Sequence, residues 1–380
     1  MNDAPVYLDY NATTPLDPAV TAAMAEYLGE RFGNPSSSHR WGRPAREAVE
    51  TARARVAALL NAEPAEIVFT SGGSEANNLA LKGVAFRHCR EGAHLVISAV
   101  EHPSVSAAAR WLAGEGFAVT EVPVDRYGQV DPDAVAAALR ADTLLVSVML
   151  ANNEVGTLQP VRRIADVAHA RGVLVHCDAA QAVGKVPVDV EALGVDLLSV
   201  AGHKFYGPKG VGALYVRSGV QLTPLVHGSR QERGCRAGTE NVPGVVGLGV
   251  AAELAARELD AELPRLRALR DRLQARLADG CPDAVFHGHP EQRLPNTCSV
   301  GFPGRDAGRL LAALGDRVAV SAGAACRAAG QTPRSHVLDA MGVPPAVAAG
   351  TLRLSLGRFT TEADVDRGAE AVLAAVNAQS

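Results

Sequence analysis

The sequence predicts an α/β fold with a large domain on a mostly parallel sheet, followed by a small C-terminal α/β domain. First, near-continuous apolar runs alternate with helical stretches along much of the chain, which is typical of parallel strands buried on both faces. Second, a long helical stretch then leads into another group of short strands and helices. Third, 380 residues are enough for two domains that each bury a core.

The N-terminal part predicts a short extended segment, a polar turn and two helices. Asp17 is suited to cap the first helix, and Pro18 to occupy its first turn, where a missing N–H costs nothing. Residues 31–42 form a loop rich in Gly, Pro and Ser, and irregular loops of this kind are often functional. Residues 44–60 carry apolar side chains at helical spacing.

The segment from residue 66 predicts a strand, a glycine-rich turn and a helix. The turn reads SGGSEANN, and its glycines Gly72 and Gly73 allow close approach of a ligand to the backbone. The N–H groups at the start of the following helix suit a phosphate, and Ser74 adds a hydroxyl. A tight turn with a serine cap is the alternative interpretation.

Polar residues follow several of the predicted strands, which cover residues 94–100, 143–150, 173–180, 196–200 and 211–216. Open α/β sheets bind ligands at the carboxyl ends of their strands, so these positions predict a binding site. The residues concerned are Glu101, His102, Asn152, Asn153, Glu154, Asp178, Gln181, His203 and Lys204.

Lys204 stands out because it follows a strand and precedes a Gly-Pro-Lys-Gly turn. A lysine held at a strand end loses hydration, which lowers its pKa and makes its amine a nucleophile toward an aldehyde. The alternative is an ordinary surface lysine.

The C-terminal part begins with a helical stretch over residues 245–278, with a bend expected near Pro264. A smaller domain follows it. We expect strands near residues 285–287, 297–302, 318–321 and 352–356, and helices near residues 308–314, 335–341 and 362–376.

Composition narrows the possible functions. A net charge of −4 argues against a general affinity for nucleic acid, and no apolar run reaches the roughly 18 residues of a membrane span. The N-terminus lacks the pattern of a signal peptide. The six cysteines show no CxxC or zinc-type spacing, so we expect no metal site and predict free thiols in a reducing compartment, with the cytoplasm as the default location.

A set of motifs then points to one family. They are YLDYNATTP, FGNPSSSH, FTSGGSEANN, EHPSV, ANNEVG, HCDAAQ, GHKFYGPKG, RAGTEN, SAGAAC and RLSLGRF. With them the chain resembles the cysteine desulfurase and selenocysteine lyase family, in the class V aminotransferase group of enzymes that use pyridoxal phosphate. The resemblance implies a fold-type I transferase with a seven-stranded sheet. It also implies a large cofactor-binding domain at 16–262, with 1–15 and 263–380 forming the small domain that carries the catalytic cysteine loop.

The resemblance assigns the cofactor contacts. It implies that Lys204 forms the Schiff base with pyridoxal phosphate, that Asp178 pairs with the pyridinium nitrogen, and that His102 stacks on the ring and moves protons. Gln181 and Asn153 would meet the phenolic oxygen. The phosphate would be held by Gly73, Ser74 and His203, together with Thr239 from a partner subunit.

Two further residues would act on the substrate. Arg353 would bind its carboxylate, as a planar guanidinium does well; the alternative is a strand-edge arginine that faces solvent. Cys326 would be the thiolate that accepts sulfur as a persulfide; the alternative is a small buried apolar residue. The chain departs from many desulfurases at Ala201, which replaces a phosphate-binding serine, and in RAAGQTPRSHV after Cys326.

The function implied is conversion of L-cysteine to L-alanine by a homodimer, with sulfur passed from Cys326 to an acceptor protein. That acceptor would belong to iron–sulfur assembly, thiolation or DNA phosphorothioation, without direct binding of nucleic acid or membrane. A selenocysteine lyase is the alternative, favoured by details of VAGHKFYGP, GSRQERG, RAGTENVPG and GAAC. A catalytically silent scaffold is a third reading, against which the intact set of Lys204, Asp178 and His102 argues.

Overall fold

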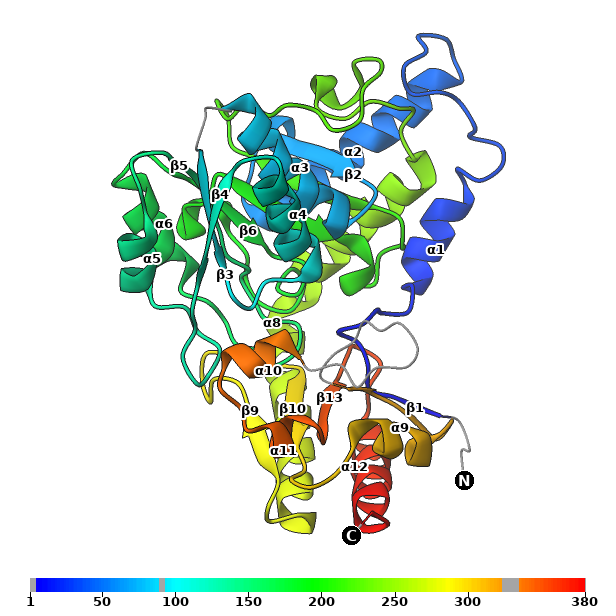
Figure 1. Ribbon diagram of the computed structural model, residues 1–380. Coiled ribbons are helices and arrows are strands. Elements are labelled where there is room, and N and C mark those ends of the chain that lie inside the picture. The colour runs from blue at the N-terminus through cyan, green and yellow to red at the C-terminus, as the bar shows by residue number, and fades with distance from the viewer. Residues whose placement is uncertain (1–4, 89–92, 323–334, 380) are drawn as a thin grey trace.

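The computed structural model describes residues 5–88, 93–322 and 335–379. Two bodies of secondary structure are connected by one long helix (Figure 1). The first is built on a seven-stranded sheet and the second on a smaller, four-stranded sheet. The predicted α/β class, with its large mostly parallel sheet and smaller C-terminal part, is confirmed. No helix among these residues is long and apolar enough to cross a membrane.

The large sheet has the strand order β2-β8-β7-β6-β5-β3-β4. Within it β8 runs antiparallel to both neighbours, and the other adjacent pairs are parallel. The edge strand β4 was not among the predicted runs. The strands are β2 (Ile67–Thr70), β3 (His94–Ser98), β4 (Ala118–Val122), β5 (Thr143–Ser147), β6 (Leu174–Asp178), β7 (Leu197–Ala201) and β8 (Gly212–Val216).

Helices cover both faces of this sheet, because successive strand residues point to opposite sides. In β3, Leu95 and Ile97 belong to the core to which α3 and α4 contribute, whereas Val96 belongs to the core on the other face, to which α2, α6 and α8 contribute. The helices of this body are α1 (Pro18–Ala25), α2 (Gly42–Leu60), α3 (Gly73–Arg87), α4 (Pro103–Gly114), α5 (Pro132–Ala138), α6 (Val161–His169), α7 (Val190–Leu193) and the 3₁₀ turns η1 (Pro64–Glu66), η2 (Gly202–Lys204) and η3 (Gln231–Gly234).

The long connection is α8 (Val242–Gly280), a single helix of 39 residues that contains Pro264. Its first part packs in the core of the large sheet through residues such as Leu248. Its last part packs in the second core, through residues such as Leu273. The predicted long helix is confirmed, and it begins three residues before the expected start at Val245.

The second body has one small antiparallel sheet with the order β12-β13-β10-β9. The strand predicted at 318–321 is divided between two sheets, since β11 pairs with the N-terminal strand and β12 with β13. The elements are β9 (Val285–His287), β10 (Thr297–Gly301), α9 (Ala307–Leu314), β11 (Val318–Ala319), β12 (Ser321–Ala322), α10 (His336–Ala340), α11 (Pro345–Ala348), β13 (Thr351–Ser355) and α12 (Glu362–Asn377).

The N-terminal segment belongs to this second body before it reaches the large sheet. Strand β1 (Val6–Tyr7) pairs with β11, and Leu8 is fully buried in the C-terminal core. Tyr10 then lies against Gly357, where any Cβ would come within 2.0 Å of the ring, so only glycine fits. Asp17 caps α1 by accepting a hydrogen bond from the N–H of Ala19 at 2.8 Å, as predicted. Residues 8–17 therefore form a second connection between the two bodies.

Candidate active site

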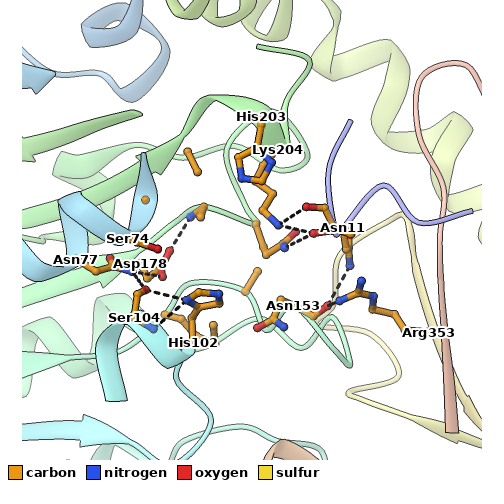
Figure 2. A pocket seen from close by; sticks show the side chains of 17 residues that line it. Asn11, Ser74, Asn77, His102, Ser104, Asn153, Asp178, His203, Lys204 and Arg353 are labelled. Atoms are coloured by element: carbon orange, nitrogen blue, oxygen red, sulfur yellow. Dashed lines mark hydrogen bonds between the residues drawn. The ribbon is translucent and has the colours of Figure 1, made fainter. Parts of the chain in front are cut away.

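A cavity of about 320 Å³ opens at the carboxyl ends of β6 and β7. The N-termini of α3 and α4, the N-terminal segment and β13 complete its wall (Figure 2). Nine of the predicted site residues line it. The full lining is Asn11, Ala12, Gly73, Ser74, Asn77, His102, Ser104, Met149, Ala151, Asn153, Asp178, Ala180, Gln181, Ala201, His203, Lys204 and Arg353.

Lys204 ends η2, directly after β7, and its side chain extends into the cavity rather than into bulk solvent (Figure 2). Its Nζ donates hydrogen bonds to the main-chain oxygens of Asn11, at 2.6 Å, and Ala12, at 2.9 Å. The surface-lysine interpretation is therefore wrong. The amine lies at the carboxyl ends of the strands, and its acceptors there are uncharged main-chain carbonyl groups of the N-terminal segment.

Asp178 is the last residue of β6 and is buried. Its Oδ1 accepts a hydrogen bond from the N–H of Ala180 at 2.9 Å, and its Oδ2 accepts one from Nδ2 of Asn77 at 2.7 Å. Cys177 points to the opposite face, as strand alternation predicts, and packs in the core. Burial raises the pKa of its thiol well above the usual value.

The start of α3 provides a cradle beside this carboxylate. Gly72 precedes the helix with a φ of 149°, and no side chain caps its first N–H groups. A Cβ on Gly73 would lie 3.2 Å from the Cβ of Ala201 and 3.8 Å from that of Ala180, so glycine leaves the space between them open. Free N–H groups at the N-terminus of a 15-residue helix suit an anion.

Two histidines face the same space, and burial is the main reason that the pKa of each is lowered. For His102, Lys204 and His336 add to this effect and Asp178 opposes it. The pKa of His203 falls to about 4, because Lys204 and other lysines add to burial. Both imidazoles are therefore neutral at neutral pH.

Arg353 lies on β13 and is only 1% exposed, so the solvent-facing alternative is wrong. Its Nη2 donates to Oδ1 of Asp9 at 2.8 Å, and its Nη1 donates to the main-chain oxygen of Asn153 at 3.0 Å. Its Nε has no partner among the described residues. The guanidinium is thus oriented by the N-terminal segment and turned toward the cavity.

Sequence reasoning missed Asn11, Asn77, Ser104 and Lys185. Lys185 is 6% exposed, and its Nζ donates to Oε1 of Gln181 at 2.7 Å and to Oδ1 of Asn11 at 3.2 Å. Burial, then the charges of Lys204 and Arg353, hold its pKa well below the usual value. Asn11, Asn77 and Ser104 lie inside quoted motifs, but nothing local distinguishes their side chains from solvated ones.

Two predicted residues remain to be accounted for. Thr239 is exposed and does not line it. Cys326 lies outside the described residues. The cysteines that are described, Cys177, Cys235, Cys281 and Cys298, are free thiols. Within the same part of the chain no group of three or more His, Cys, Asp or Glu side chains is arranged to hold a metal ion.

Comparison with known proteins identifies the family. The model of the aminotransferase class-V family matches residues 6–367. The chain belongs to this family. Membership implies dependence on pyridoxal phosphate, and the cavity fits that group: it combines an amine, a buried carboxylate and the open cradle at Gly73.

Similar proteins narrow the comparison to cysteine desulfurases. The chain is 49% identical over 97% of its length to cysteine desulfurase IscS of Methanosarcina thermophila, of which it covers 91%. The structure of a NifS-like protein matches with a TM-score of 0.91 and 40% identity, over 97% of this chain and 98% of that one. A structure described as SspA in complex with cysteine matches with a TM-score of 0.81 and 37% identity, over 93% and 99% of the two chains.

The residue before His102 gives a testable pH effect. Glu101 is completely buried, which raises its pKa to about 8; hydrogen bonds from Ser98 and Met149 oppose the rise. In the unfolded chain the pKa of a Glu carboxyl group is about 4.3. Between this pH and about pH 8 the folded protein therefore keeps a proton on Glu101 that the unfolded chain loses. Glu101 therefore makes the protein lose stability as pH rises from about 5 through 8.

We predict that Glu101→Gln reduces this loss. The free energy of unfolding, measured with urea at several pH values, should fall less between about pH 5 and 8 in the variant than in the wild type. The exposed Glu115→Gln is the control and should follow the wild-type curve. Parallel curves for Glu101→Gln and the wild type would contradict the buried proton.

Proposed function

We propose that this chain is a pyridoxal phosphate-dependent cysteine desulfurase, which converts L-cysteine to L-alanine and passes the sulfur on as a persulfide. The observation that carries the proposal is the convergence of Lys204, Asp178 and Arg353 on one cavity from three separate parts of the chain. Similarity to named cysteine desulfurases over almost the whole length supports the same activity.

The cofactor would be held from three sides. Lys204 would bind it covalently, and Asp178 would hold a proton on its ring nitrogen. Gln181 and Asn153 would meet its phenolic oxygen, since both line the cavity near Lys204. The N–H groups at Gly73 and Ser74, with His203, would receive its phosphate, and Ala201 would leave one phosphate contact unmade.

The remaining residues would act on the substrate. Arg353 would bind the α-carboxylate, a planar match that a buried guanidinium makes with two parallel hydrogen bonds. His102 would lie against the ring and take part in proton transfer. When bound, pyridoxal phosphate withdraws electrons from the α-carbon, which makes loss of its proton possible.

Cys326 would complete the reaction. Its thiolate attacks the substrate sulfur, an S–S bond forms, and the Cβ–S bond of the substrate breaks. The electron pair of that bond stays with the carbon side, which takes up a proton and leaves as alanine. The sulfur is oxidised as the carbon is reduced, so no outside oxidant is needed.

We also propose a domain division at 16–262 against 1–15 with 263–380, and a homodimer in which Thr239 of each subunit reaches the other's phosphate. Thr239 is exposed and does not line the cavity of its own chain, which supports a role in trans. The persulfide would pass to an acceptor protein of iron–sulfur assembly, thiolation or DNA phosphorothioation. The free thiols fit a reducing cytoplasm.

Turnover of L-cysteine tests the activity. The purified enzyme should release alanine from L-cysteine, and Lys204→Ala should abolish this while the fold remains, because little packing is lost. Lys209→Ala, an exposed lysine in the same turn, is the control and should keep wild-type turnover. Alanine production by Lys204→Ala would refute the assignment of Lys204 as the cofactor-binding lysine. In the wild type, a much higher kcat/KM for L-selenocysteine than for L-cysteine would favour the selenocysteine lyase alternative.

Cys326→Ser tests the persulfide. The variant should still bind L-cysteine, seen as a change in the visible spectrum of the bound cofactor, but should make no alanine from it. Selenium leaves carbon more readily than sulfur, so release of selenide from L-selenocysteine should persist. Desulfuration of L-cysteine at the wild-type rate would rule out Cys326 as the acceptor.

The proposed sharing of the site between subunits gives a further prediction. Thr239→Ala should weaken retention of pyridoxal phosphate, because Ala201 already provides no hydroxyl to the phosphate. Cofactor affinity measured by dialysis and absorbance should fall, and sedimentation should show a dimer at micromolar concentration. A fully active monomer, or unchanged cofactor affinity in the variant, would contradict the contribution in trans.

A further inference from the structure

Four side chains form a continuous hydrogen-bonded path along one wall of the cavity (Figure 2). Oδ2 of Asp178 accepts from Nδ2 of Asn77 at 2.7 Å, and the same Nδ2 donates to Oγ of Ser104 at 2.8 Å. Oγ of Ser104 lies 2.8 Å from Nδ1 of His102. The path therefore connects the carboxylate beneath the site to the imidazole beside it.

The direction of each hydrogen bond follows from the carboxylate end. Nδ2 of Asn77 is the donor to Oδ2 of Asp178, so the group of Asn77 that faces the carboxyl group is its NH₂. The second hydrogen of that NH₂ points at Oγ of Ser104. Because Oγ already receives this bond, its own hydrogen is available for Nδ1 of His102.

The main chain fixes the last step. His102 precedes α4 and caps it with its own ring, because Nδ1 accepts the N–H of Ser104 at 3.2 Å. A backbone N–H is always a donor, so Nδ1 must carry a lone pair. With Nδ1 occupied by two donors, the single proton of the neutral ring is on Nε2. No described residue bonds Nε2, which leaves it for a ligand in the cavity.

We infer that Asn77 and Ser104 are positioning residues that hold His102 as the Nε2–H tautomer and keep a second proton off Nδ1. His102 then meets the reacting molecule as a hydrogen-bond donor to an oxygen or sulfur atom. An imidazole that already carries hydrogen on Nε2 cannot take up the α-carbon proton at that nitrogen. This inference rests on the proposed function and narrows the part that it gives to His102.

Nothing local in the sequence marks this arrangement. Asn77 is 1% exposed, and its Oδ1 has no hydrogen-bond partner among the described residues. A buried amide with one unsatisfied oxygen is costly. The cost is understandable if the position is needed for the two bonds that its NH₂ donates.

The tautomer can be observed directly by ¹⁵N NMR of the full-length holoenzyme labelled at its histidines. The signal of His102 is identified by its absence in His102→Gln. At neutral pH we expect Nδ1 to be unprotonated and Nε2 to carry hydrogen, with the same pattern after the cofactor is removed. A protonated Nδ1, in either the other tautomer or an imidazolium, would overturn the inference.

Ser104→Ala tests the clamp itself. Loss of a donor to the neutral ring should raise the pKa of His102 and increase the share of the Nδ1–H tautomer roughly tenfold. Asp178, Lys204 and His336 also act on this ring, and the substitution leaves them in place. The kcat for L-cysteine should fall in proportion to the loss of the Nε2–H tautomer, with KM little changed.

Matched variants separate the outcomes. Ser106→Ala, on the same helix and without a side-chain hydrogen bond to a described residue, should match the wild type, and Ser104→Thr should restore its ¹⁵N pattern. If Ser104→Ala leaves the pattern and pKa of His102 unchanged, the clamp is wrong. If Ser104→Ala does not fold, the ¹⁵N patterns of Ser104→Thr and of the wild type still test the inference. An Nε2–H tautomer in an enzyme inactive with L-cysteine would refute the proposed function but not this inference.

Discussion

The candidate site depends on one residue of the N-terminal segment. The main-chain oxygen of Asn11 accepts hydrogen bonds from Nζ of Lys204 at 2.6 Å and from Nε2 of Gln181 at 2.9 Å. Its Nδ2 donates to Oγ1 of Thr297 at 2.8 Å, and its N–H donates to Oγ of Ser355 at 2.9 Å. Asn11 thus connects Lys204 and Gln181, which follow strands of the large sheet, to β10 and β13 of the small sheet. The cavity lies where the N-terminal segment and the two sheets meet.

The same polar contacts explain the electrostatics of the cavity. The charges of Lys204 and Arg353 lower the pKa of Lys185, and the charges of Lys204 and Lys185 lower the pKa of His203. In both cases burial lowers the pKa more than any single charge does. Buried cations repel one another strongly where the dielectric is low. A dianionic phosphate at the start of α3 would offset this repulsion. The fold therefore keeps positive charge ready for an anionic ligand while keeping its imidazoles neutral.

Sequence patterns predicted the features that depend only on the pattern of buried residues within a single helix or strand. The apolar runs of β3, β5, β6 and β7 are buried on both faces and were found, whereas edge strand β4 is half-exposed and alternates weakly as AVTEV. The polar residues after the strands were also found, because parallel strands bring their ends together. The direction of Arg353 and the roles of Asn11 and Lys185 depend on partners far along the chain, 344 residues away for Asp9 and Arg353. No local pattern encodes such contacts, although the motifs that contain Asn11 and Arg353 were recognised.

In the proposed enzyme, the amine held by Asn11 and Ala12 would be the one that binds the cofactor. Borohydride reduction of the purified enzyme, followed by mass spectrometry of its peptides, tests this most directly, because reduction makes the bond between lysine and pyridoxal phosphate permanent. We expect the pyridoxyl group on Lys204. Modification of Lys185, the buried lysine that shares the Asn11 contact, or of no lysine at all, would contradict it.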